Sequence, residues 1–137
     1  MTEKSNHTKF IEAINSLPEL DQYKTTAYIF DAVFGTDDLS KLTYKTLRGA
    51  KNNLKKAFGV SCLHEYVGLK GLEEIDPLYA AGGDMVIALD EGEDEHDDVA
   101  FCTGTRWLYF DDEDAQQHTR FSIKHIDDVK LIAYRIT

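Results

Sequence analysis

The stretch YKTTAYIFDAVFG, residues Tyr23–Gly35, predicts the helix around which the rest of the chain is organised. Apolar residues lie on nearly every side of it from Thr26 to Phe34, so we expect other helices and a sheet to enclose it. Thr25 stands in its first turn, where a threonine hydroxyl can accept a backbone N–H that has no partner within the helix. The stretch therefore predicts a buried central helix with a polar start.

Three further helices are expected around the central one. The first is limited by Pro18, and the third carries basic residues on its flank. The segment Cys62–Leu69 predicts a short fourth helix. Apolar residues at helical spacing mark the first helix (Phe10, Ile11, Ile14, Leu17) and the third helix (Leu47, Ala50, Leu54, Phe58).

After Pro77 the pattern changes to short runs typical of strands, separated by turns that contain acidic residues or glycine. Helices first and strands afterwards favour an α+β fold. We therefore expect one domain, residues 1–137, in which N-terminal helices pack on a C-terminal, mostly antiparallel sheet of about five strands. The predicted strands are Met85–Leu89, Val99–Gly104, Trp107–Phe110, Arg120–Ile123 and Val129–Ile136.

The composition is that of an ordinary globular domain, with 42% hydrophobic and 29% charged residues in 137. No apolar run reaches the roughly 18–20 residues that span a bilayer, and the first ten residues lack the apolar segment of a secretory signal. Two cysteines do not make a disulfide framework in a chain of this size. These features predict a reducing, intracellular compartment and no membrane association.

The net charge of −10 is unevenly distributed along the chain. Asp90–Asp98 holds seven acids and Asp111–Asp114 holds four, and the remaining 14 acids nearly balance the 15 lysines and arginines. Lys41–Lys56 holds six basic residues and no acid. The acidic runs are expected to be loops between strands, and the molecule is expected to have a strong dipole.

Familiar catalytic and metal-binding motifs are missing. The acidic run Asp90–Asp98 does not follow the alternating ligand pattern of a calcium loop, so we predict no metal site and no cofactor. Cys62 and His64 are two residues apart on one short helix, where their side chains diverge, and Cys62 and Cys102 are both expected in the core. Lys41–Lys56 lacks interleaved aromatic residues, which disfavours nucleic acid as a partner.

Several segments, taken in order, resemble an uncharacterised phage-associated family related to NlpC-type, papain-fold cysteine peptidases. They are KTTAYIFDAVFG, the basic helix after it, LHEYVGL, GGDMVIALD with its Gly83-Asp84 pair, DVAFCTG and LIAYRI. The resemblance covers the chain from about Phe10 to Ile136. It implies a papain-like α+β fold in which a nucleophile at the start of the central helix faces a base at the start of a strand.

The departures from this family bear on activity. An Asp-Cys pair precedes the helix in the family, and here those positions hold Lys24 and Thr25, while the histidine position holds Asp98. A threonine hydroxyl needs a strong base to become a nucleophile, and a carboxylate with a pKa near 4 is a poor one. His96, a displaced base two residues earlier, would lie about 6–7 Å from the expected place. The resemblance therefore implies a peptidase scaffold without catalysis.

The favoured function is a non-catalytic phage virion or tail component, or a tail-assembly factor, that acts through protein–protein contacts. Its partners would be other phage structural proteins or a second copy in a homo-oligomer, in the host cytoplasm during assembly or in the virion tail. Two alternatives remain: a small acidic phage effector that inhibits a host nucleic-acid-binding protein, and a residual cell-wall peptidase or amidase. The residues predicted to bind are Lys45, Arg48, Lys51 and Lys55 on the basic side, and Glu93, Asp94, Asp111 and Asp112 on the acidic side.

Overall fold

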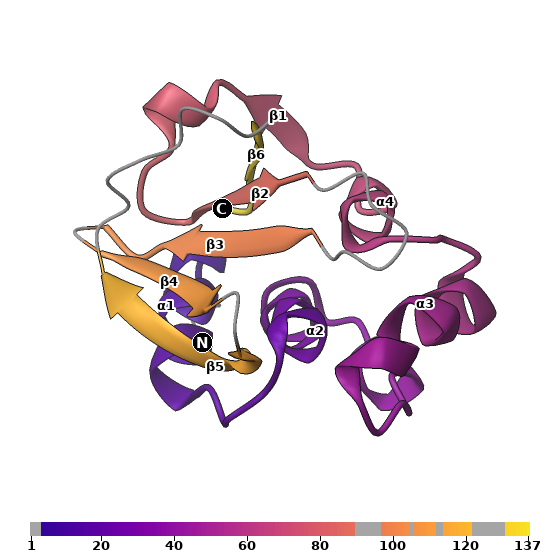
Figure 1. Ribbon diagram of the computed structural model, residues 1–137. Coiled ribbons are helices and arrows are strands. Elements are labelled where there is room, and N and C mark those ends of the chain that lie inside the picture. Colours follow the sequence, from indigo (N-terminus) through magenta and orange to yellow (C-terminus); the bar gives the residue numbers. More distant parts are fainter. Residues whose placement is uncertain (1–3, 90–96, 105, 112–113, 122–130) are drawn as a thin grey trace.

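The computed structural model describes residues 4–89, 97–104, 106–111, 114–121 and 131–137. Helices come first and an antiparallel sheet follows, which confirms the α+β class (Figure 1). The helices are α1 (Asn6–Ser16), α2 (Gln22–Phe34), α3 (Ala50–Phe58) and α4 (Leu63–Gly68), with short 3₁₀ turns η1 (Leu39–Lys41), η2 (Leu47–Gly49) and η3 (Pro77–Tyr79). The strands are β1 (Glu73–Ile75), β2 (Asp84–Ala88), β3 (Asp98–Cys102), β4 (Trp107–Asp111), β5 (Asp114–Phe121) and β6 (Leu131–Arg135).

The sheet has six strands in the order β1-β6-β2-β3-β4-β5, and every neighbouring pair is antiparallel. The sequence predicted about five strands because β1, with the sequence EEI, has too few apolar residues to indicate a strand. Its pairing with β6, in which Glu74 lies opposite Tyr134, makes it the edge of the sheet. β5 begins at Asp114, well before the predicted Arg120. The sequence did not indicate this earlier start, because DAQQHTRF is polar and carries no apolar alternation.

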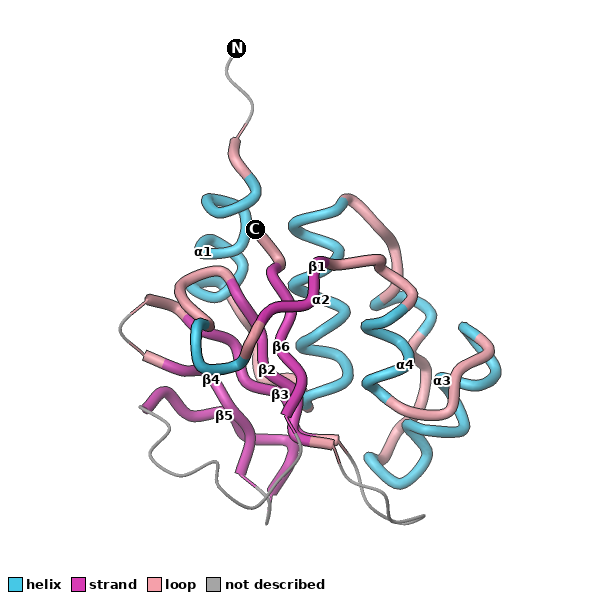
Figure 2. Tube along the Cα trace, turned by 90° about the horizontal axis from the view of Figure 1, so that it is seen from above, coloured by secondary structure: helices cyan, strands magenta, loops and turns pink. Residues whose placement is uncertain are grey.

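The core lies between the helices and the sheet, and it includes buried side chains of α3 and α4 as well as of α1 and α2. Figures 1 and 2 show α1 and α2 beside the strands, with α3 farthest from them. Ile29 and Phe30 of α2 and Met85, Ile87 and Phe101 of the sheet are all 0% exposed. The prediction of an enclosed central helix is therefore confirmed, and burial of its apolar side chains is a main source of stability.

The two ends of α2 follow from its sequence. Asp21 caps the start, because its Oδ1 accepts the Lys24 backbone N–H at 2.9 Å. The helix ends at Gly35, whose φ of 72° lies in the left-handed region that favours glycine. Asp31 then shapes the following turn, because its carboxylate accepts the Asp38 and Leu39 backbone N–H groups at 2.8 and 3.0 Å. The chain leaves α2 in a defined direction towards α3 and α4.

A buried cluster of Asp38, Tyr66 and Lys70 holds α4 against the turn after α2. Asp38 is 5% exposed, and its Oδ2 accepts the Tyr66 hydroxyl at 2.7 Å and forms an ion pair with Lys70. The Lys70 ammonium also lies 5.3 Å from the Tyr66 ring centroid, at cation–π distance. This polar cluster is therefore satisfied internally.

Candidate functional site

The start of α2 holds the predicted nucleophile position, Thr25. Its side chain is 0% exposed, and its Oγ1 donates to the Leu20 carbonyl at 3.2 Å. The prediction that this hydroxyl accepts a backbone N–H is wrong, because Asp21 occupies the cap and the threonine donates backwards instead. Thr25 is enclosed and hydrogen-bonded, and therefore cannot reach a substrate without local opening.

The start of β3 holds the predicted base position, Asp98, which is half-buried. Its neighbour Asp97 is 4% exposed, and Asp97 Oδ2 accepts the backbone N–H of His64 at 3.0 Å. This bond ties the first turn of α4 to the start of β3. The sequence placed Asp97 in a solvated acidic run, and only its position directly before an apolar strand could have indicated burial.

The start of α2 and the start of β3 influence the same side chain. Tyr23 is 0% exposed, and burial followed by the charges of Asp97, Cys62, Asp21 and Asp98 raises the pKa of its phenol far above the ordinary value. Carboxylates at the start of α2 and at the start of β3 therefore act on the same buried phenol.

Cys62 lies at this end of the molecule, directly before α4, and is half-buried, so the prediction that it lies in the core is wrong. Burial raises the pKa of its thiol, the backbone at Glu65 lowers it, and the carboxylates of Asp97 and Glu65 raise it further. The nucleophilic form of cysteine is the thiolate, so this environment suppresses reactivity. Cys102 is 3% exposed, as predicted.

No cysteine in the described ranges is hydrogen-bonded to a histidine. Cys62 Sγ lies 3.7 Å from Glu65 Oε1, and Cys102 Sγ lies 3.8 Å from the Gly104 carbonyl oxygen. The imidazole of His7 instead lies 3.5 Å from the Thr137 hydroxyl at the other end of the chain. A thiolate–imidazolium pair is thus not formed by these side chains.

The position that holds an acid in the family is Lys24, and here it belongs to a structural contact with Tyr44. The Lys24 ammonium lies 4.6 Å from the Tyr44 ring centroid and donates to the Tyr44 carbonyl at 3.4 Å. The Tyr44 hydroxyl in turn donates to the Asp21 carboxylate at 2.6 Å. The sequence alone did not indicate this contact, since no local pattern joins residues so far apart in the chain.

The paired motif residues Gly83 and Asp84 also have structural roles. Gly83 has a φ of 94°, and an added Cβ would lie only 2.1 Å from the Thr137 hydroxyl oxygen, so only glycine fits. Asp84 is 4% exposed, and its Oδ2 accepts the Ala81 backbone N–H at 2.8 Å. Both residues shape the turn that leads into β2.

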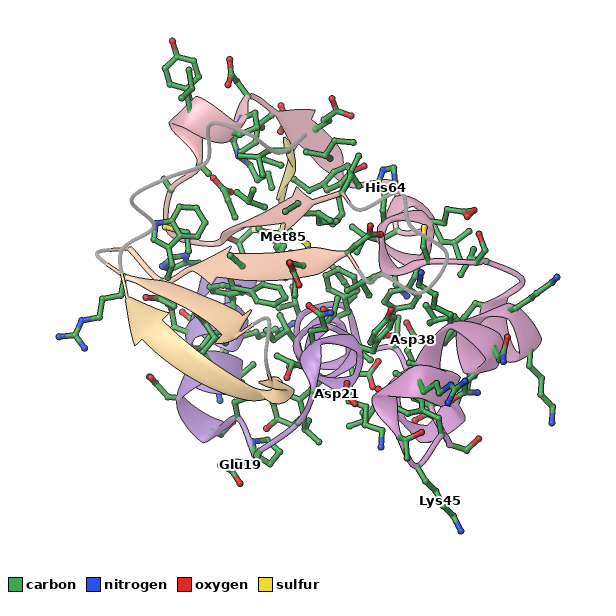
Figure 3. All side chains as sticks on the ribbon, viewed as in Figure 1. Glu19, Asp21, Asp38, Lys45, His64 and Met85 are labelled. Atoms are coloured by element: carbon green, nitrogen blue, oxygen red, sulfur yellow. The ribbon has the colours of Figure 1, made fainter. Side chains whose placement is uncertain are left out.

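The predicted basic residues lie on and just before α3. Lys45, Arg48 and Lys55 are exposed, and none of the three forms an ion pair with any residue of the described ranges. Figure 3 shows the Lys45 side chain extending away from the body of the protein. Lys51 is half-buried. We call the exposed Lys45, Arg48 and Lys55, together with the exposed Lys56 of α3, the basic surface.

The predicted acidic partners cannot be placed in the same way. Glu93, Asp94 and Asp112 lie outside the described residues. Asp111 is the last residue of β4, and its side chain also lies outside the description. Contact between these acids and the basic surface of another copy therefore stays a prediction.

Comparison with known proteins identifies no relative of the chain. No family model, no curated protein and no solved structure matches the chain. Within the part of the chain that the structure describes, no group of three or more His, Cys, Asp or Glu side chains could hold a metal ion. None of the helices in the described ranges is long and apolar enough to cross a bilayer. The family resemblance therefore stays a prediction.

Proposed function

We propose that this chain is a non-catalytic bacteriophage protein, a tail component or tail-assembly factor, that acts through protein–protein contacts. The observation that carries the non-catalytic part is the state of Thr25, which is fully buried and whose hydroxyl is hydrogen-bonded to the Leu20 carbonyl. A nucleophile must contact its substrate and be activated by a neighbouring base. Thr25 meets neither requirement, and the raised pKa of Cys62 disfavours that thiol as a replacement.

The phage setting rests on the resemblance. The resemblance agrees with the order of helices followed by an antiparallel sheet, and with the carboxylates at the starts of α2 and β3 that act on the same buried Tyr23 phenol. A fold of this kind can serve functions other than catalysis, because function depends on the site and not on the scaffold. Lys45, Arg48 and Lys55 are exposed and form no ion pair with a residue that the structure describes, so they supply a surface for an acidic protein partner.

The acidic-effector alternative has weaker support. A protein that mimics the phosphates of nucleic acid must display its carboxylates, and four of the described acids, Asp38 among them, are buried inside the fold. Asp21, Asp84 and Asp97 are at most 8% exposed, and each accepts at least one backbone N–H. Competition between the protein and DNA for host nucleic-acid-binding proteins distinguishes the two functions, and we expect no competition.

A thiol placed at the nucleophile position tests the loss of catalysis. In a Cys62→Ser background, we expect Thr25→Cys to be labelled slowly by a small thiol reagent and to leave purified peptidoglycan intact. Thr46→Cys is the matched control, because Thr46 is exposed and its thiol should react at once. If Thr25→Cys reacts faster than Thr46→Cys at neutral pH, an activating pocket is still present and the non-catalytic proposal fails.

Deletion of the gene tests the role in assembly. In a lysogen whose prophage encodes the chain, we expect induction without the gene to give normal host lysis and defective tails by electron microscopy. Expression of the Thr25→Ala protein should restore infectious particles, since the proposal assigns no chemistry to this hydroxyl. Normal tails and normal titres in the absence of the gene would contradict the proposal.

A further inference from the structure

Three large hydrophobic side chains are exposed in the described part of the chain, and two of them are adjacent. Leu78 is 79% exposed and Tyr79 is 77% exposed, both in η3, and Leu69 at the end of α4 is 58% exposed. Single exposed apolar residues are ordinary, but a paired leucine and tyrosine on a rigid turn are typical of contact surfaces.

The turn that presents this pair is fixed by its own hydrogen bonds. Asp76 Oδ1 accepts the Leu78 backbone N–H at 3.0 Å, and the Asp76 carbonyl accepts the Tyr79 backbone N–H at 2.9 Å. The two side chains are therefore held outward before any partner binds. Such preorganisation lowers the conformational entropy that association costs.

Acidic residues surround the apolar pair. Glu74 of β1 and Asp76 are exposed, and Glu73, also exposed, forms an ion pair with Arg135 of β6 at 3.4 Å. β1 pairs with β6 alone, so these side chains stand at the edge of the sheet. We call Glu73, Glu74, Asp76, Leu78 and Tyr79 the β1–η3 edge.

The basic surface has the complementary chemistry. It consists of Lys45, Arg48, Lys55 and Lys56, all exposed and without an ion pair in the described ranges. Long basic side chains offer both a charge for carboxylates and an aliphatic stem for apolar groups, and their cations also bind aromatic rings. A surface of this kind suits an acidic edge that carries a leucine and a tyrosine.

The two surfaces lie on different sides of the molecule. Figure 1 shows η3 and β1 at the top and α3 at the lower right, and Figure 2 again separates them across the body of the protein. They cannot meet within one copy. Contact between the surfaces of two copies is heterologous, and repetition of it gives a ring or a filament.

We propose that copies of this chain associate head to tail, with the β1–η3 edge of one copy against the basic surface of the next. The inference rests on the proposed function, because it names a second copy as the structural partner. In this contact the preorganised β1–η3 edge takes the place of the acidic segments Asp90–Asp98 and Asp111–Asp114 as the partner of the basic surface. Tyr79 packs against the Lys45 and Arg48 side chains of the neighbour, and Glu74 pairs with its cations.

Two variants, each defective on one surface, test this geometry. The edge variant carries Glu74→Lys and Tyr79→Ser, and the basic variant carries Lys45→Glu and Arg48→Glu. We expect the unmodified protein to associate at low salt, about 0.01 M, and to dissociate towards about 1 M as screening shortens the range of charge attraction. In sedimentation velocity, each variant alone should be monomeric, with association weakened about tenfold or more.

An equimolar mixture of the two variants gives the decisive result. The edge variant keeps a working basic surface and the basic variant keeps a working edge, so one contact can form and no second one can follow. We expect a particle of twice the monomer mass and nothing larger. Leu69→Ser and Glu19→Lys are matched controls, an exposed leucine and an exposed acid outside the proposed contact, and both should associate like the unmodified protein.

The outcomes separate this inference from the proposed function. A chain that stays monomeric at every salt concentration, or a mixture that stays monomeric while the unmodified chain associates, overturns the head-to-tail contact. Either result leaves binding to other phage structural proteins intact. Normal tails without the gene would instead overturn the proposed function, while self-association would be measured as before.

Discussion

The start of α2 and the surface of α3 use their polar residues in opposite ways. Asp21, Thr25 and Asp97 are buried and hydrogen-bonded within the fold, whereas Lys45 and Arg48 are exposed and without an ion pair in the described ranges. The first set contributes to stability and has no capacity left for a ligand. The second set costs little to expose and can bind. The difference favours the exposed surface of α3, rather than the start of α2, as the place where the proposed binding occurs.

The largest expected effect comes from the buried Asp38 cluster. Asp38→Ala leaves the Lys70 ammonium and the Tyr66 hydroxyl without their acceptor, and we expect the free energy of unfolding to fall by about 3 kcal/mol. Urea denaturation measures it. Tyr66→Phe keeps the ion pair and should cost only about 1 kcal/mol. Equal losses in the two variants would show that the ion pair adds nothing.

The next largest effect concerns the cap of α2. Asp21→Ala removes the acceptor of both the Lys24 backbone N–H and the Tyr44 hydroxyl, so the free energy of unfolding should fall by about 2 kcal/mol. Thermal unfolding by circular dichroism measures the change. Asp37→Ala is the control, since Asp37 is exposed and should be neutral. A neutral Asp21→Ala would contradict the structural role of this carboxylate.

Gln22 offers a change of opposite sign. Its side chain is 0% exposed, and neither its Nε2 nor its Oε1 has a hydrogen-bond partner among the residues that the structure describes. Because an unpaired buried amide is costly, Gln22→Met should raise the free energy of unfolding by about 1 kcal/mol at similar volume. Urea denaturation of the unmodified protein and of Gln22→Met measures the difference in the free energy of unfolding. A loss of stability would indicate that the amide has a bound water as its partner.

A smaller effect is expected from pH. Burial raises the pKa of Asp38, but the hydrogen bonds from Lys70 and Tyr66 outweigh it and hold the pKa below the ordinary value. The contribution of this group is therefore complete above the unfolded pKa of about 3.9 and is lost as pH falls through the folded pKa. The free energy of unfolding, measured by urea denaturation, should therefore fall between about pH 6 and pH 3 as Asp38 is protonated. Asp38→Asn should flatten that part of the profile.

The smallest effect on stability is predicted for the exposed cations. Lys45→Glu with Arg48→Glu should change the free energy of unfolding by no more than about 0.5 kcal/mol, although it weakens association. Asp21→Ala should do the reverse, with lower stability and unchanged association while folded. A large loss of stability in the basic variant would erase the contrast between the two regions.

Much of the fold could be predicted because it follows from short-range patterns. The enclosed helix at Tyr23–Gly35, the stripe that includes Ala50 and Leu54, and the alternating runs after Pro77 each indicate an element by local periodicity. β1 could not be predicted, because three residues with two glutamates become a strand only by pairing with β6. The start of β5 could not be predicted for the same reason, because its polar residues form a strand only by pairing with β4.

The candidate site was predictable only in part. The sequence by itself determined the residue types, a hydroxyl at Thr25 and a carboxylate at Asp98, together with the separation of charge between Lys41–Lys56 and the acidic segments. Only the tertiary structure decided that Thr25 donates to Leu20 and that Asp97 is buried against α4. It also decided that Leu78 and Tyr79 face outward. The physical reason is that each residue has its side-chain chemistry whatever the fold, whereas its burial and hydrogen-bond partners depend on segments that meet only when the chain has folded.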